Sequence, residues 1–194
     1  MGPKAVLTAI AAGAAALFLV NSLLVGGASA AVTVLGGGLA HDCSLAARDG
    51  RADVDAVAIC TMALESEPLT ARERAGTFIN RGVIKLRMKA FESARQDFTM
   101  AIRADGALGE AYVNRGAAMI ALKRYPEGLA DIDKGIALGS EEPEKAWYNR
   151  GLAHEKLDDM KSAYFDYRKA LELKPGWDMP QKELQRFTVT EVGG

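Results

Sequence analysis

The chain has 194 residues, enough for one domain of ordinary size. Its 24 basic and 25 acidic residues give a net charge of −1, and no basic block stands out. A nucleic-acid-binding protein needs a clustered basic face, so nucleic acid is not an expected partner.

Residues 1–30 have the pattern of an export signal. Lys4 is the only charge in this stretch, an apolar run covers residues 5–25, and small residues ending at Ala30 form a cleavage site. The run is also about as long as a membrane span, so a retained anchor is the alternative. We expect a bacterial periplasmic or otherwise exported protein, cleaved after Ala30. If the signal is retained, the protein is anchored in the inner membrane and touches it only through residues 5–25.

Residues 31–41 contain a glycine cluster and show no helical periodicity, which predicts a flexible lead-in. Two cysteines follow, Cys43 and Cys60. In an oxidising compartment, an even pair of cysteines predicts a disulfide.

The tripeptide Asn-Arg-Gly occurs three times, at residues 80–82, 114–116 and 149–151. The spacings of 34 and 35 residues indicate stacked structural repeats. Around each tripeptide, large and small residues recur in register, which predicts two helices that cross closely. The large residues are Phe78, Tyr112 and Trp147 on the first helices and Phe98, Ile132 and Tyr167 on the second; the small ones include Ala94, Gly128 and Ala163.

This pattern resembles the tetratricopeptide repeat, a helical hairpin of about 34 residues. The resemblance covers residues 75–177, divided into repeats at 75–108, 109–143 and 144–177. It implies an all-α solenoid, an α-α superhelix built of helical hairpins. Residues 178–187 then form the capping helix that the last repeat requires, and residues 188–194 form a loose tail.

The same template extends backwards over residues 42–68 as a degenerate repeat. In this alignment Cys43 and Cys60 occupy positions that face each other within one hairpin. A disulfide there would staple an end repeat that has a neighbour on one side only. A redox-active pair or a metal site is the alternative, although the spacing of these cysteines is not typical of either.

Each repeat also carries an arginine followed 16 residues later by an aspartate. The pairs are Arg81 with Asp97, Arg115 with Asp131 and Arg150 with Asp166. We favour internal pairs that hold each hairpin in register over a ladder of ligand-binding arginines, because the opposite charges are strictly matched.

The first helices of stacked hairpins line a concave face, which we expect to bind another protein or a peptide. Its asparagines offer a donor and an acceptor to an extended backbone, and its apolar residues offer anchors. Two alternatives stay open: the asparagines bond a neighbouring repeat, or the glycine-rich N-terminal segment fills the groove. The expected site residues are Ile79, Asn80, Val83, Leu86, Val113, Asn114, Ala117, Ile120, Lys145, Tyr148, Asn149 and Leu152.

One subgroup of the resembled family clamps the acidic C-termini of heat-shock chaperones. The chain matches that clamp only at Asn114 and Lys145, since Ile79, Val83 and Asn149 replace its other polar and basic residues. We therefore do not expect that ligand.

Catalytic motifs are missing from the sequence: it has no nucleophile elbow, no phosphate-binding loop and no His-Glu-x-x-His. His154 takes a position that packs between helices. We expect a non-enzymatic interaction module or scaffold of the cell envelope, without cofactor or metal. The alternatives are a membrane-anchored assembly factor and a redox or metal protein acting through its two cysteines.

Overall fold

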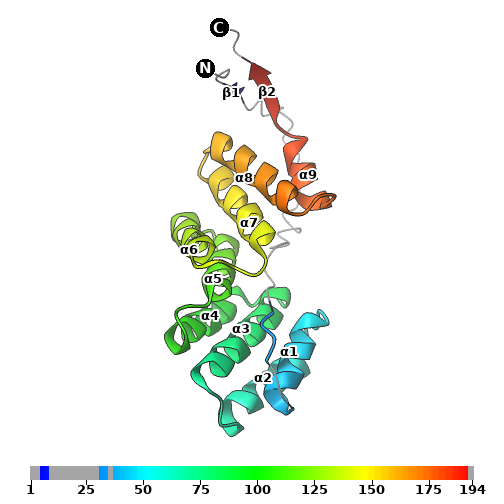
Figure 1. The fold of residues 1–194 in the computed structure, drawn as a ribbon, viewed down its shortest axis with the longest axis vertical. Helices are drawn as coiled ribbons and strands as arrows, with labels where there is room; N and C mark the ends of the chain where they lie inside the picture. The colour runs from blue at the N-terminus through cyan, green and yellow to red at the C-terminus, as the bar shows by residue number, and fades with distance from the viewer. Residues whose placement is uncertain (1–4, 9–30, 35–36, 192–194) are drawn as a thin grey trace.

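A computed structural model describes residues 5–8, 31–34 and 37–191. In this part of the chain, nine helices follow one another as stacked antiparallel hairpins, and Figure 1 shows them rising from α1–α2 to α8–α9. The predicted solenoid of helical hairpins is confirmed. The helices are α1 (Leu39–Arg48), α2 (Val54–Ser66), α3 (Ala71–Arg87), α4 (Phe91–Ala104), α5 (Gly109–Ala121), α6 (Tyr125–Leu138), α7 (Pro143–Lys156), α8 (Met160–Leu173) and α9 (Asp178–Leu184).

The glycine of each Asn-Arg-Gly tripeptide is where the two helices of a hairpin touch. A Cβ atom on Gly82 would lie 2.5 Å from Cε1 of Phe98, and one on Gly151 would lie 2.7 Å from Cε1 of Tyr167. In the middle hairpin a Cβ on Gly116 would lie 2.7 Å from the carbonyl oxygen of Gly128. Only glycine lets the second helix approach this closely, so the recurring glycine follows from the packing.

The turn inside each repeat has the same backbone conformation. Lys89, Lys123 and Asp158 have φ of 62°, 62° and 61°, although none of them is glycine. They lie at equivalent places in the three hairpins, where the chain leaves the first helix and must reverse direction. This conformation could not be predicted from the residue types, because such turns usually take glycine or asparagine.

The N-terminal hairpin begins inside the expected lead-in. Helix α1 starts at Leu39, and its first free amides, those of Leu39 and Ala40, donate to the carboxylate of Glu67 at 2.6 and 3.0 Å. A distant side chain therefore caps α1, in place of the usual residue just before the helix.

At the other end, α9 packs Leu184 beside Tyr167 and Trp177 in one apolar cluster. Residues 188–194 were expected to form a loose tail. Instead, Thr188–Glu191 (β2) pairs antiparallel with Ala5–Thr8 (β1), so that backbone hydrogen bonding orders a stretch without helical periodicity. The rest of the expected signal or anchor, residues 1–4 and 9–30, lies outside the described residues. Among those described, no helix is both long and apolar enough to cross a membrane.

Candidate functional site

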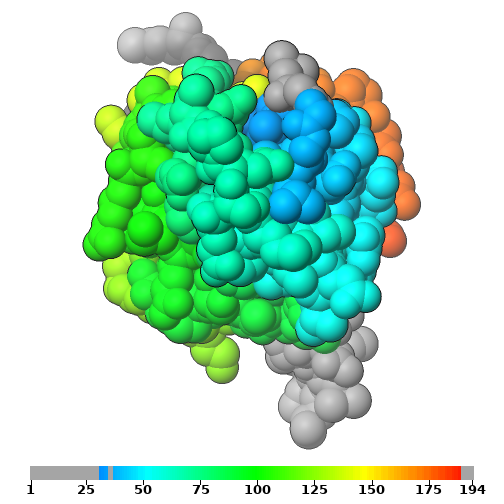
Figure 2. All heavy atoms as spheres, turned by 90° about the horizontal axis from the view of Figure 1, so that it is seen from below, coloured from blue at the N-terminus to red at the C-terminus, as the bar shows by residue number. Residues whose placement is uncertain are grey.

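Asn80 lies on the inner face of α3 and binds the backbone of an extended segment. Its side chain is fully buried, and Nδ2 donates to the carbonyl oxygen of Val32 at 2.8 Å. Gly76, one turn earlier, gives the segment room: a Cβ there would stand 3.1 Å from Val32 and 3.4 Å from Val34. Residues 31–34 thus lie directly on α3, and Figure 2 shows them in blue beside the teal spheres of this helix.

Helix α1 holds the other side of this segment. Nδ1 of His41 lies 2.9 Å from the carbonyl oxygen of Val34. Because a carbonyl only accepts, this ring nitrogen carries the hydrogen. Nη1 of Arg48 donates to Oγ1 of Thr33 at 3.4 Å. The side chains alternate, since Val34 is buried and Thr33 is exposed, as expected for an extended strand on an apolar surface.

The groove was expected to be open, with the glycine-rich N-terminal segment as the alternative that fills it, and residues 31–34 of that segment do lie against α3. Sequence reasoning missed their contacts, because His41 and Asn80 bind them through backbone carbonyls. Every residue has such a carbonyl, so no motif marks the partner. The only signal was the Val-Thr-Val alternation at residues 32–34.

The apolar residues expected on an open concave strip are buried. Ile79 and Val83 are fully buried and Leu86 is 5% exposed, within a core cluster that also contains Phe98 of α4 and Ala111 of α5. The reason is that α3 packs against α5 as well as against α4. These residues form the wall between repeats, and their role in partner binding remains a prediction.

In the second and third repeats the expected apolar site residues also pack in the core clusters. Val113 and Ile120 pack with Ile132, Ala117 joins the first core cluster, and Tyr148 and Leu152 pack in the cluster that α9 closes. Lys145 pairs with Glu142 one turn earlier, 2.5 Å away. The expected site residues therefore lie along one side of the stacked first helices, but their apolar side chains point into the core.

The asparagines differ from these apolar residues because their hydrogen bonding is incomplete. Asn114 and Asn149 are each 1% exposed. Neither amide atom of Asn149 has a hydrogen-bond partner in the described structure, and the same is true of Oδ1 of Asn80. A buried amide without partners costs on the order of 1–3 kcal/mol, so Asn149 is kept at a cost to stability.

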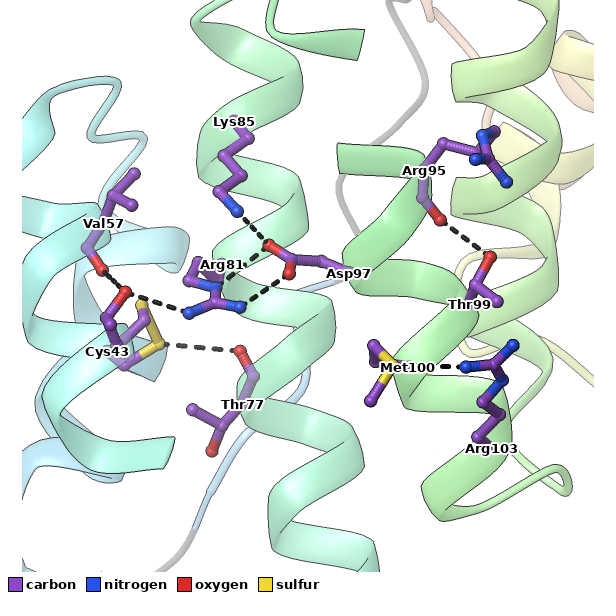
Figure 3. A network of polar contacts seen from close by, with 12 residues as sticks. Cys43, Val57, Thr77, Arg81, Lys85, Arg95, Asp97, Thr99, Met100 and Arg103 are labelled. Atoms are coloured by element: carbon purple, nitrogen blue, oxygen red, sulfur yellow. Dashed lines mark hydrogen bonds and ion pairs between the residues drawn. A yellow bond between two sulfur atoms is a disulfide. The ribbon is translucent and has the colours of Figure 1, made fainter. Parts of the chain in front are cut away.

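The three Arg–Asp pairs are internal, as favoured from the sequence. Arg81 donates to Asp97 through Nε at 3.0 Å and Nη2 at 2.8 Å, and Figure 3 shows this fork between α3 and α4. Arg115 and Arg150 make the same two-pronged contact to their own aspartates. The hydrogen bond to Asp131 raises the pKa of Arg115. These arginines therefore form ion pairs within their own hairpins and do not form a row of ligand-binding cations.

Two further partners of each arginine were missed. Its guanidinium lies over the aromatic ring three residues earlier, at 5.5, 5.7 and 4.1 Å for Phe78, Tyr112 and Trp147. Its Nη1 also reaches a polar side chain of the preceding repeat. Those side chains are Thr61 at 2.9 Å, Thr99 at 3.5 Å and Asp133 at 2.9 Å. One arginine thus joins both helices of its hairpin to the hairpin before it.

Cys43 and Cys60 lie in the N-terminal hairpin, formed by α1 and α2, with their sulfur atoms 2.09 Å apart, the separation of a disulfide. Both are fully buried among Ala46, Ala47 and Ile84. Reactive cysteines are partly exposed in electropositive surroundings, so this burial argues against the redox alternative. No group of three or more metal-binding side chains occurs within the described ranges.

His154 lies between α7 and α8, with its ring nitrogens 3.5 and 3.8 Å from carboxylate oxygens of Asp159 and Asp166. Its side chain is 19% exposed. These contacts place it in the same inter-helix layer as the arginines, where it links the two helices of the third hairpin.

Known proteins share this fold and part of this sequence. The family model described as tetratricopeptide repeat matches residues 144–176. An Hsp70-Hsp90 organizing protein of Triticum aestivum is 38% identical over 85 residues, which are 44% of this chain and 14% of that protein. The chain therefore spans a small part of this relative's length.

Two solved structures extend the comparison. The TPR domain of Arabidopsis OM64 superposes with a TM-score of 0.57 at 28% identity, covering 60% of this chain and 95% of that domain. The first TPR of Spaghetti (RPAP3), bound to the HSP90 peptide SRMEEVD, gives a TM-score of 0.56 at 25% identity, covering 59% and 90%. The family match and these structures agree on an all-α tetratricopeptide-repeat fold.

Proposed function

We propose that this tetratricopeptide-repeat chain is a non-enzymatic protein-interaction module that binds an extended peptide along the inner face of its first helices. The contact between Asn80 and the carbonyl of Val32 carries this proposal, because it is already a bond between the asparagine row and an extended backbone. Asn149 is buried with both amide atoms unpartnered, so it has a donor and an acceptor to offer to a ligand backbone.

The ligand that we propose differs from an acidic chaperone C-terminus. The RPAP3 domain was solved with the HSP90 peptide SRMEEVD, which supports peptide binding by this kind of fold. In the present chain the clamp positions of the first repeat hold Ile79 and Val83, both buried and apolar. A carboxylate placed beside them would lose its hydration without gaining a partner.

The test uses a displayed library of random peptides, selected on the full-length protein, followed by fluorescence anisotropy with the best binder. Asn149→Leu keeps the branched shape and the number of side-chain heavy atoms and replaces the amide by two methyl groups. We expect it to weaken peptide binding by about tenfold or more, the effect of roughly 1.4 kcal/mol, while leaving stability unchanged or raised. Met100→Ala, on the exposed side of α4, is the matched control. Equal affinity in Asn149→Leu and wild type would contradict the proposal.

We further propose that the protein is exported and cleaved after Ala30, with the retained inner-membrane anchor as the alternative. The charge pattern of residues 1–30 supports this. Cleavage would remove β1 and leave β2 without its partner strand. Intact-mass measurement of the protein from an envelope fraction decides between the two: an amino terminus at Ala31 supports cleavage, and a full-length mass supports the anchor.

A further inference from the structure

The groove between α1 and α3 already holds four residues of the chain itself, and their contacts define what the groove recognises. Val32 and Val34 point to Gly76, where helix α3 has no side chain. Their carbonyl oxygens receive Asn80 and His41. Thr33, between them, is exposed. The groove thus accommodates branched apolar side chains two residues apart. Its polar side chains bind the backbone carbonyl oxygen of each of these two residues.

From these contacts we infer that the groove between α1 and α3 is a recognition site for an extended peptide with the pattern Val-x-Val, or similar β-branched residues at alternate positions. In the free protein, residues 31–34 occupy this site in cis. This inference rests on the proposed function and deepens it, because it names the partner's chemistry.

The chemistry of the groove selects this pattern in three ways. Gly76 leaves a depression on α3 that a Cβ would fill, so a side chain from the ligand can rest on the helix backbone. Ala40 and Ala63, both small, surround Val34. Asn80 and the Nδ1 hydrogen of His41 satisfy carbonyl oxygens that would otherwise be buried unpaired. Long or charged side chains at either valine position would meet packed alanines and would lose hydration.

Occupation in cis has a measurable consequence. A segment tethered a few residues from its site acts at an effective concentration on the order of 1 mM. A free peptide of equal intrinsic affinity must compete with this segment. Its apparent affinity is therefore its intrinsic affinity multiplied by the fraction of protein whose groove is open. Weakening the docked segment, without touching the groove, should therefore strengthen peptide binding.

The probe is the acetylated hexapeptide Ala-Val-Thr-Val-Gly-Gly, labelled with fluorescein at its carboxyl end, with Ala-Asp-Thr-Asp-Gly-Gly as its matched control. Binding to the full-length protein is measured by anisotropy. In Val32→Asp the docked segment carries a charge and should leave the groove. We expect this variant to bind the valine probe about tenfold or more tighter than wild type, and to leave the aspartate probe unbound.

Adding Asn80→Leu to Val32→Asp should abolish this gain, because the donor to the ligand carbonyl is lost. Val32→Thr, which is nearly isosteric, gives a smaller gain in the same direction and replaces Val32→Asp if circular dichroism shows that the aspartate variant is unfolded. Equal binding of the valine probe to wild type and to both Val32 variants overturns the inference.

The outcome for the proposed function is separate. If library peptides without alternating branched residues bind these variants and depend on Asn149, the module still binds peptides and only the Val-x-Val pattern is wrong. Formation of dimers by Val32→Asp, measured by light scattering, would show that the groove accepts another part of a second copy, and this also overturns the pattern.

Discussion

Asp97 accepts from two cations at once. Arg81 reaches it through Nε and Nη2, and the ammonium of Lys85 lies 2.7 Å from its Oδ2. Asp97 is only 5% exposed, and both cations are 16% exposed. In the next repeat, Asp131 pairs with Arg115, and Met119 stands where Lys85 stands in the first repeat. The first hairpin therefore depends on one carboxylate for two half-buried charges.

Removing that carboxylate should destabilise the protein strongly. Asp97→Ala leaves two cations near each other without a counter-charge, and breaking a buried ion pair in this way costs about 3–5 kcal/mol. Urea unfolding followed by circular dichroism measures the loss. Asp131→Ala is the matched control and should cost less, because one cation is left and Asp131 is more exposed.

Adding Lys85→Met to Asp97→Ala should recover part of the loss, since it copies the second repeat and removes one unpaired charge. If Asp97→Ala and Asp131→Ala cost the same and Lys85→Met restores nothing, Lys85 does not take part in the pair.

Gly82→Ala tests the close contact of α3 with α4. The new Cβ would lie 2.5 Å from the rigid ring of Phe98, so the ring or the helix must move. Overpacking of this kind costs about 1–3 kcal/mol. Gly106→Ala is the control, because its Cβ would meet only ordinary contacts at 3.4 and 3.7 Å. Unfolding midpoints of the two variants should differ clearly, and equal midpoints would mean that the hairpin can open there without cost.

Much of this architecture follows from the sequence because it is periodic. The recurrence of Asn-Arg-Gly fixed the register, and the register placed Gly82 opposite Phe98 and Arg81 opposite Asp97. The pairing of Cys43 with Cys60 in one hairpin came from extending the same register backwards. Each of these contacts repeats or extends a local pattern, so it could be predicted from the residue types and their spacing.

The contacts that were missed are made by short segments without a period. Residues 31–34 dock through backbone carbonyls, and β1 pairs with β2 from the opposite end of the chain. Neither contact produces a periodic pattern in the sequence from which it could be predicted. The inner face was also misjudged in one respect. Ile79 and Val83 were expected to be exposed, but the first helices of adjacent repeats pack on each other and bury them.

Reduction should loosen the N-terminal hairpin of α1 and α2. Closing a loop of 17 residues by a disulfide between Cys43 and Cys60 is worth on the order of 3 kcal/mol in the chain-entropy model. We expect a reductant to lower the urea midpoint and to speed hydrogen exchange in α1, while α7 and α8 keep their protection. In the double variant Cys43→Ala, Cys60→Ala, reductant should have no effect. Two titratable thiols in the untreated protein would contradict the bond.

Alkaline pH should destabilise the C-terminal hairpin through its buried tyrosines. Burial raises the pKa of Tyr167 far above its ordinary value of 10, and its hydroxyl donates to Oε2 of Glu155 at 3.0 Å. Burial also raises the pKa of Tyr148. Above about pH 10 these groups ionise only in the unfolded chain, so that the folded state binds more protons there. Stability therefore falls as pH rises, by about 1.4 kcal/mol per pH unit for each tyrosine.

Tyr167→Phe separates this effect from general alkaline unfolding. At pH 7 it should cost about 1 kcal/mol for the lost hydrogen bond to Glu155. Above pH 10 its unfolding free energy should fall less steeply than that of wild type, because one ionisable group is gone. Phenylalanine already occupies the equivalent place in the first repeat, as Phe98. Urea unfolding at pH 7, 9 and 11, with tyrosinate absorbance as the second signal, measures both. Parallel curves for the two proteins would mean that Tyr167 ionises in the folded state as readily as in the unfolded one.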